Sequence, residues 1–408
     1  MMPLSKKRMA FAYAFFFSAI ILLFQGCPPQ RPEAPTLTPS VMTRLPSERY
    51  PDFMDDMAFD GIGHAIDQSL SYLKKIPEDR RFTFGPDQFT SNQLIRALSH
   101  FKAFIASNPP HADLNTYIRA NYWVYEAAGS DTSGEVLFTG YYEPNLRGSR
   151  LQTERYQYPV YARPENLIPI DLSLFSPEYK GKTLIGRIAG DKIVPYDDRT
   201  AIEGGSLEGI AIPLAWVDDP VDLFFLQIQG SGKIYLNTGE VLNVHYHISN
   251  GKPYRSIGKL LIEQNKIPKS DISMQTIRSY LKAHPEELSD IFSYNPSYVF
   301  FKTEIDGPIG CLDVKLTPGR SLAVDRRIFP MPTLSFIQTK RPLTDGAGAI
   351  TAWTDCARFV LNQDTGGAIR GPGRADLFWG NGAYAELAAG HMQHSGRLYF
   401  LVLKSDAP

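Results

Sequence analysis

The residues with the clearest capacity for chemistry lie in a glycine-rich stretch near the C-terminus, residues 363–380, which reads QDTGGAIRGPGRADLFWG. It contains Asp364 and Asp376, twelve positions apart, and five glycines. Glycine at this density permits positive φ and lets a bulky ligand approach the backbone closely. An apolar run precedes the stretch, and aromatic residues follow Asp376. This pattern would place one carboxyl group over a cleft, where it can donate and accept protons.

Two other chemistries compete for the same part of the sequence. Asp364-Thr365-Gly366 is the signature triplet of aspartic proteases, which share one proton between two aspartates. A second triplet in a suitable apolar frame is missing, since residues 131–134 read DTSG with one extra residue; a homodimeric protease stays open. His245 and His247 alternate along one predicted strand, but without a third ligand they indicate a hydrogen-bonded polar strand rather than zinc. We expect no metal and no cofactor.

The composition is that of an ordinary globular protein with many turns. Of 408 residues, 43% are apolar and 21% are charged, and the net charge is −1. This balance argues against a global basic field that would recruit nucleic acid. The 32 Gly, 31 Pro, 21 Tyr and 24 Phe residues favour a β-rich fold. The aromatic rings would also suit a carbohydrate groove, although most single aromatic residues belong to a core.

The N-terminus has the pattern of an export signal. Three basic residues at 6–8 precede an apolar stretch at 9–24, and Gln-Gly-Cys follows, ending at Cys27. The stretch is short for a membrane span, which needs about 20 residues. The pattern predicts a lipoprotein signal at 1–27 with Cys27 acylated, on the periplasmic face of a Gram-negative outer membrane. Simple secretion and an uncleaved anchor are the alternatives. Residues 28–46, rich in Pro, Thr and Ser, are predicted to be a flexible linker.

Two further cysteines, Cys311 and Cys356, follow Cys27. In an oxidising periplasm they could pair, and two free buried thiols are an equally good interpretation.

The elements that must position these residues show mixed periodicity. Helical spacing predicts helices at 67–75, 91–105, 257–264 and 274–284, with Ser91 as N-cap of the second and Asp271 or Ser273 as N-cap of the last. Residues 134–144 predict a strand that ends in a Gly-Tyr-Tyr turn. From about 147 to 244, turn signals are frequent enough to predict a separate all-β unit, with the apolar runs 210–217 and 223–230 as examples of its strands.

The last hundred residues predict short strands once more. Their ranges are 298–301, 321–324, 335–339, 349–353, 358–361 and 397–403. Six such strands are enough to close a small barrel. Barrel-like segments on both sides of an all-β unit predict an inserted domain.

Six motifs occur in an order that resembles a known family. They are FTGYYEP (138–144), LQIQGSGKIYL (226–236), NGKPYRSIGKLL (250–261), NPSYVFFK (295–302), LTPGRSLAVDRRIFP (316–330) and DTGGAIRG with ADLFWG (364–380). Together they resemble the membrane-bound lytic murein transglycosylase A family, and they span most of the mature chain. The resemblance implies a mainly β fold with flanking helices. A double-psi β-barrel of residues 47–145 and 251–408 is interrupted by an inserted β-domain of residues 146–250, with a glycan groove between them.

The resemblance also implies a reaction and its residues. Enzymes of this family cleave the β-1,4 bond between N-acetylmuramic acid and N-acetylglucosamine in peptidoglycan, and leave 1,6-anhydromuramic acid ends. The muramic acid 6-hydroxyl is the nucleophile, so one carboxyl can act as acid and then as base. That carboxyl falls on Asp376, although the spacer at 371–375 is about one residue longer than usual. An apolar wall is expected to keep it protonated, and Leu377, Phe378 and Trp379 are candidates.

The family's other two aspartates fall on Asp364 and Asp325, for which structural support is the favoured interpretation. Substrate contacts are expected from one loop on each side of the groove; the residues are Thr139, Gly140 and Tyr141, and Gln229, Gly230, Ser231 and Gly232. A tight turn whose glycines serve geometry alone is an equal alternative for each loop. Lys252 and Tyr254 are weaker candidates for contact with the stem peptide or sugars. Besides a protease, a non-catalytic murein-binding lipoprotein is the rival hypothesis.

Overall fold

The computed structural model of the protein describes residues 41–131 and 133–405. The predicted signal, Cys27 and most of the linker lie outside these residues. Within the described ranges, no helix is both long and apolar enough to cross a bilayer.

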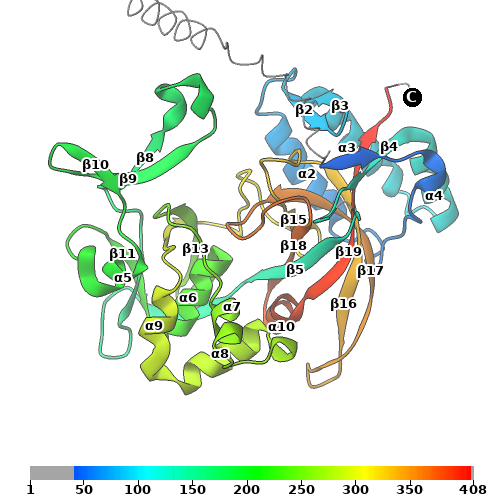
Figure 1. Ribbon diagram of the computed structural model, residues 1–408. Coiled ribbons are helices and arrows are strands. Elements are labelled where there is room, and N and C mark those ends of the chain that lie inside the picture. Colours follow the sequence, from blue (N-terminus) through cyan, green and yellow to red (C-terminus); the bar gives the residue numbers. More distant parts are fainter. Residues whose placement is uncertain (1–40, 132, 406–408) are drawn as a thin grey trace, which may run out of the picture. The chain divides into compact units, whose positions relative to one another are not determined.

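A closed ring of six strands forms the barrel (Figure 1). Its order is β19-β16-β17-β15-β18-β5, and β5 pairs back to β19. The strands are β5 (Val136–Glu143), β15 (Ser321–Ala323), β16 (Leu334–Thr344), β17 (Ile350–Asp364), β18 (Arg374–Asn381) and β19 (Gln393–Leu403). The β15–β17 and β18–β5 pairs are parallel, and the other pairs are antiparallel. The predicted barrel, built from residues on both sides of an insertion, is confirmed.

One barrel strand is longer than the sequence predicted. Residues 349–353 and 358–361 were expected to be two strands, but β17 runs through both without a break. Residues 350–361 of β17 pair with β16 in one long hairpin, and its last residues pair with β15. The polar residues between the two apolar runs do not end the strand because cross-strand partners compensate them. For example, the Nζ atom of Lys340 lies 2.6 Å from Oδ1 of Asp355, directly opposite on β17.

Helices and a short hairpin flank the barrel (Figure 1). They are α2 (Ile62–Leu73), α3 (Ser91–Ile105), α4 (His111–Asn121) and α10 (Ala383–His391), with β1 (Met42–Arg44), β4 (Tyr122–Ala127) and the β2–β3 hairpin (Arg81–Phe84 and Asp87–Thr90). Helices α2 and α3 contact β17 and β19. The N-cap of α3 is Thr90 rather than Ser91: the Thr90 hydroxyl accepts the amide of Gln93, whose side chain returns the bond.

A buried ion pair fixes the N-terminal segment against the barrel. The Arg320 guanidinium donates to both carboxylate oxygens of Asp55, at 2.6 and 2.8 Å, and both side chains are almost fully buried. Arg320 also donates to the backbone carbonyls of Asp60 and Phe359. A buried pair is tolerated when further hydrogen bonds satisfy its donors, as they do here.

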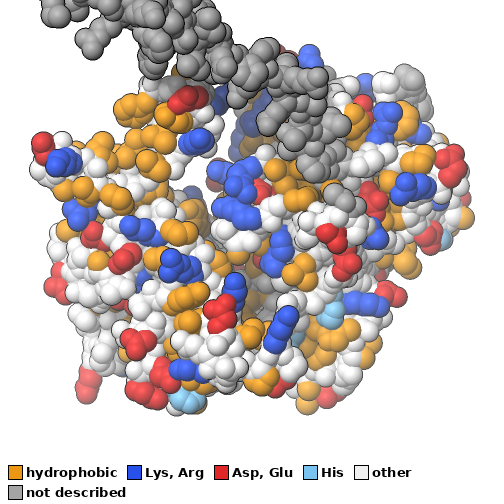
Figure 2. Space-filling view, in the orientation of Figure 1, with side chains coloured by type: hydrophobic (Ala, Val, Ile, Leu, Met, Phe, Trp, Pro, Cys, Tyr) orange, Lys and Arg blue, Asp and Glu red, His pale blue; other side chains and the backbone are white. Residues whose placement is uncertain are grey.

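The inserted region contains two further sheets. The six-stranded sheet has the order β14-β13-β12-β6-β11-β7, and a separate three-stranded sheet has the order β10-β9-β8. The strands are β6 (Asn145–Ser149), β7 (Tyr158–Tyr161), β8 (Ile168–Asp171), β9 (Thr183–Ala189), β10 (Lys192–Pro195), β11 (Pro213–Val217), β12 (Ser231–Leu236), β13 (Val241–Ser249) and β14 (Val299–Glu304). Figure 2 shows apolar side chains gathered over β9 and β10, where Ile188 and Ile193 are exposed.

Helices accompany this sheet: α5 (Arg199–Ala201), α6 (Pro220–Gln229), α7 (Ile257–Glu263), α8 (Met274–Ala283) and α9 (Leu288–Ser293). Helices α7 and α8 confirm two predictions, and Ser273 is the N-cap of α8. The strand expected at 223–230 is wrong, because these residues belong to α6. Asp219 caps α6, Pro220 occupies its first turn, and Gly230 ends it with φ 81°.

The domain boundaries of 146–250 and 251–408 stay a prediction. Strand β14 lies within the range predicted for the barrel segment, yet it pairs with β13 of the six-stranded sheet. We propose on this ground that the inserted domain extends to about residue 304, where β14 ends.

Candidate active site

The parallel pairing of β5 with β18 brings Thr139 directly opposite Asp376. The Thr139 hydroxyl donates a hydrogen bond to Oδ1 of Asp376. These residues are 237 positions apart in the sequence, and the barrel alone makes them neighbours. The sequence predicted both as site residues, and the structure brings them together.

Arg374 is a member of this cluster that the sequence interpretation missed. It lies two residues before Asp376 on β18, so both side chains point to the same face of the strand. Its Nη2 atom donates to Oγ1 of Thr139 at 3.1 Å and lies 3.5 Å from Oδ1 of Asp376. Residues 374–381 were not predicted to be a strand; had they been, the period of two between Arg374 and Asp376 was the signal that could have found Arg374.

Asp364 lies on the same face of the barrel wall, across one strand. Ala323 of β15 pairs with Asp364 on one side and with Asp376 on the other. Two strand spacings put the two aspartate Cα atoms about 10 Å apart. Oδ2 of Asp364 accepts the Tyr141 hydroxyl at 3.0 Å, and Oδ1 accepts the backbone N–H of Cys311 at 3.0 Å. Both oxygens of Asp364 are therefore occupied.

Burial dominates the electrostatics of both carboxyl groups. It raises the pKa of Asp364 to about 6, against the opposing effect of the bonds from Thr365, Tyr141 and Cys311, with the charge of Asp376 adding to the rise. Burial also raises the pKa of Asp376, although the Thr139 hydroxyl and the Arg374 guanidinium oppose it.

The second oxygen of Asp376 distinguishes it from Asp364. Its side chain remains 19% exposed, and Oδ2 accepts no hydrogen bond from any described residue. Asp376 thus has a carboxyl group with a raised pKa, and one of its two oxygens, Oδ2, has no hydrogen-bond partner among the described residues.

Only one of the three predicted wall residues lies beside the site. Phe378 lies two residues after Asp376 on β18, so both side chains are on the same face of the strand. The Phe378 ring centroid lies 5.1 Å from that of Tyr141. Leu377 and Trp379 point to the opposite face, where they belong to the barrel core. They were wrong as wall candidates because strand alternation sends neighbouring side chains to opposite faces.

The inserted region also reaches this site. Tyr254, in the segment after β13, is close enough for the charge of Asp376 to raise its pKa, in addition to the larger effect of burial. One of the two weaker candidates, Tyr254, therefore lies near Asp376.

The remaining predicted substrate contacts have structural tasks of their own. A Cβ at Gly140 would lie 2.7 Å from the Trp379 ring and 2.8 Å from the backbone of α10, so this glycine permits close packing on the face away from Asp376. Gln229 ends α6 and accepts the backbone N–H of Tyr142 at 3.0 Å. Gly230 caps α6, while Ser231 and Gly232 begin β12. Their contact with sugar stays a prediction.

Asp325 has a different environment. Its carboxylate accepts two bonds from the Arg327 guanidinium, at 2.9 and 2.6 Å, and one from the Gly371 amide at 2.9 Å. Burial alone would raise its pKa, but these donors and the Arg327 amide outweigh burial and lower the pKa of Asp325 to about 2. The carboxylate is fully buried and holds the loop before β18 in place.

Among the described residues, Cys311 is the cysteine that contacts this cluster, through its backbone amide on Asp364. Cys311 is exposed and Cys356 is buried, and both thiols are free. In the part of the chain that the structure describes, no three His, Cys, Asp or Glu side chains are grouped to hold a metal ion.

Known proteins match both parts of this architecture. A family model described as the MltA specific insert domain matches residues 137–302, and a 3D domain model matches residues 320–402. The membrane-bound lytic murein transglycosylase A of Escherichia coli K12 is 34% identical over 280 residues, 68% of each chain. Its counterpart in Vibrio cholerae is 31% identical over 286 residues, 69% of each chain. The chain belongs to the membrane-bound lytic murein transglycosylase A family.

Solved structures agree with this family. A membrane-bound lytic murein transglycosylase from Agrobacterium tumefaciens has a TM-score of 0.72 at 28% identity, and the match covers 89% of this chain and 97% of that one. An E. coli transglycosylase A structure with bound chitohexaose has a TM-score of 0.65 at 25% identity, with 92% and 99% covered. The protein is thus a peptidoglycan lytic transglycosylase. These relatives do not support the protease and the non-catalytic binder.

Proposed function

We propose that this transglycosylase cleaves the β-1,4 bond between N-acetylmuramic acid and N-acetylglucosamine with Asp376 as its single acid and base. The observation that carries this is the open Oδ2 atom of Asp376, on a carboxyl group whose pKa is raised. A protonated carboxyl with one unengaged oxygen can reach a glycosidic oxygen. Asp364 lacks such an oxygen because two donors hold it.

One residue, Asp376, can both donate the proton that the reaction needs and recover it afterwards. Asp376 gives its proton to the leaving glycosidic oxygen as the bond to C1 breaks. The muramic acid 6-hydroxyl then attacks C1 and returns its proton to Asp376, so the product carries a 1,6-anhydro ring and the enzyme is restored. Arg374 stabilises the carboxylate between the two steps, and Thr139 fixes its orientation. A hydrolase would instead use a second carboxylate to activate water.

Product analysis tests this proposal. Purified murein is digested with the protein, and the released fragments are weighed by mass spectrometry. We expect 1,6-anhydromuramic acid ends, which are lighter by one water than reducing ends. Reducing ends would refute the intramolecular nucleophile and would indicate a hydrolase.

We also propose that acylated Cys27 anchors the enzyme at the periplasmic face of the outer membrane of a Gram-negative cell. The signal pattern and the membrane-bound names of the relatives support this. Cys27→Ala is expected to move the protein out of the outer-membrane fraction or to leave its signal uncleaved. A variant that still fractionates with lipid attached would exclude Cys27 as the anchor.

A further inference from the structure

A second candidate site lies in the inserted region, on the six-stranded sheet. It is an open pocket of about 440 Å³. Its lining residues are Ala162, Arg163, Pro164, Glu165, Leu214, His247, Phe301, Lys302 and Thr303. The volume is within the range of small-molecule sites in proteins, about 300–1,000 Å³. None of these residues belongs to the cluster around Asp376.

A β-bulge directs one histidine into this pocket. In the β13–β14 pair, Tyr246 opposes Phe301 and Ile248 opposes Phe300, so His247 is an extra residue without a partner. A bulge of this kind turns a side chain away from its regular alternation. His245 consequently stays buried against the 305–314 loop, while His247 is exposed in the pocket.

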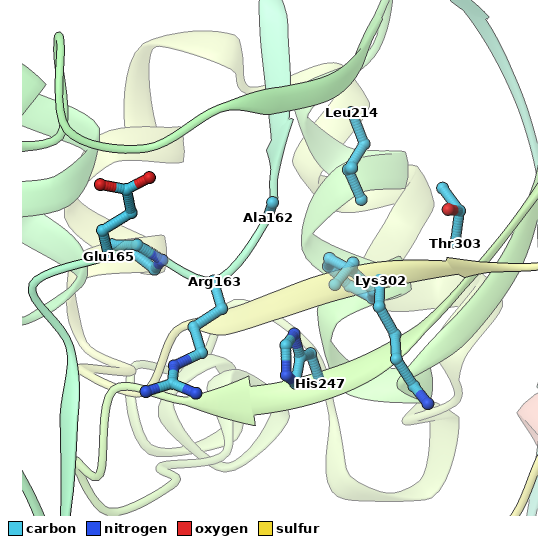
Figure 3. Close-up of a pocket in the computed structure, with 9 residues that line it drawn as sticks. Ala162, Arg163, Glu165, Leu214, His247, Lys302 and Thr303 are labelled. Carbon is cyan, nitrogen blue, oxygen red and sulfur yellow. The ribbon is translucent and has the colours of Figure 1, made fainter.

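The pocket carries an excess of positive charge. Figure 3 shows Arg163, His247 and Lys302 along one side, with His247 between the two cations. Burial and the charges of Arg163 and Lys302 lower the pKa of His247. Arg163 forms no ion pair with any described residue, and its one hydrogen bond is to the carbonyl of Leu167 at 2.8 Å.

The acidic residues nearby leave part of this charge uncompensated. Lys302 pairs with Glu304 at 2.5 Å, so its charge is shared. The carboxylate of Glu165 points away from the Arg163 guanidinium in Figure 3. A guanidinium with free donors beside a histidine suits a carboxylate, which it can bind through two parallel bonds.

Part of the pocket lining is apolar. Its apolar members include the half-buried Leu214 and Ala162 and the almost fully buried Phe301, which a β-bridge joins to Ala162. The site therefore pairs a small apolar surface with a cationic rim. A short peptide with a free carboxylate and methyl-sized side chains has the matching chemistry.

We propose that this pocket binds a carboxylate of the peptide substituent of murein. The inference rests on the proposed function only in taking murein as the substrate. Strand β14 leads directly into the loop at 305–314, whose Cys311 amide donates to Asp364. A peptide held at β14 would therefore bind beside the segment that leads to the barrel site.

The test is calorimetric titration of the full chain with a sugar-free murein tetrapeptide. We expect saturable binding that weakens at least tenfold in Arg163→Gln, and equally when the peptide carboxylates are amidated. Arg163→Lys should recover part of the affinity, because it keeps the charge but loses the planar fork. Arg81→Gln and Lys180→Gln, at exposed sites elsewhere, are the matched controls and should bind like the parent.

Several outcomes would overturn the proposal. One is that the free peptide does not bind at millimolar concentration. A second is that the parent and Arg163→Gln bind the peptide equally well. A third is that Arg163→Gln loses as much affinity for chitohexaose as it loses for the peptide. Loss of binding to phosphatidylglycerol vesicles alone would assign the pocket to lipid headgroups. A peptide without sugar has no bond for Asp376 to cleave, so a failed acid assignment would leave this result unchanged.

Discussion

Asp325 and Asp376 belong to the same barrel domain, but their environments shift their pKa values in opposite directions. Asp325 is fully buried and has a pKa of about 2, whereas Asp376 is 19% exposed and its pKa is raised. Burial raises the pKa in both places, so burial cannot be the difference. Asp325 receives four donors, including both arms of a guanidinium, while Asp376 has one hydroxyl and a more distant arginine. The count and geometry of donors separate the structural carboxylate of Asp325 from the carboxyl group that we propose as the proton carrier.

The largest expected effect comes from removing the proton carrier. Asp376→Asn keeps the shape but cannot transfer a proton, and should reduce release of anhydro products by about a thousandfold or more. The rate is measured on purified murein, with the melting temperature as a check of folding. Asp355→Asn, on the exposed part of β17, is the matched control. Near-parental turnover by Asp376→Asn would show that Asp376 is not the proton carrier.

Removing the structural carboxylate should instead lower stability. The native pKa of Asp325, about 2, is below the unfolded value of about 3.9, so its contribution is complete above the unfolded pKa and is lost as pH falls through 2. Asp325→Asn should therefore cost on the order of 2–3 kcal/mol at pH 7, and about half of that at pH 3. Urea unfolding at both pH values measures it. A loss that does not change with pH would contradict the assigned ion pair.

Asp364 should show the opposite slope. Its native pKa, about 6, is above the unfolded value, so the native state holds the proton more tightly and the parent loses stability as pH rises from about 4 to 6. Relative to the parent, Asp364→Asn should gain on the order of 2 kcal/mol over this interval. The same urea titrations give the result. A slope of the same sign as that of Asp325→Asn would show that the donors outweigh burial at Asp364 too.

The smallest effect is expected from Arg374. Its charge opposes the rise in the pKa of Asp376, so Arg374→Gln should raise that pKa further and move the alkaline limb of the pH–rate profile to higher pH. The maximal rate should fall by no more than about tenfold. Arg374→Lys should restore the limb, because it keeps the charge. An unmoved limb in Arg374→Gln would leave Arg374 with a packing role only.

A site residue could be predicted from the sequence only where residues close to it in the sequence indicated its role. Asp376 and Thr139 were found through sequence motifs. Arg374 shares a strand face with Asp376, and the period of two could have revealed it. The Cys311 amide could not be predicted, because its bond to Asp364 depends on how a loop 53 residues away in sequence folds back.

The sequence by itself determined strands β5, β15, β16 and β19, both halves of β17, helices α2 and α3 beside the barrel and the positions of the three aspartates, because period, caps and motifs are local. It did not predict β18, α4 or α10, and the strand predicted at 298–301 pairs in the six-stranded sheet instead of the barrel. It failed at 223–230, where a continuous apolar run fits a buried strand or a helix equally well. Only the tertiary structure decided that Thr139 meets Asp376, that the pKa of Asp325 is lowered while that of Asp376 is raised, and that four separate segments form the basic pocket. The reason is that donors, burial and concave surfaces arise from contacts between distant segments.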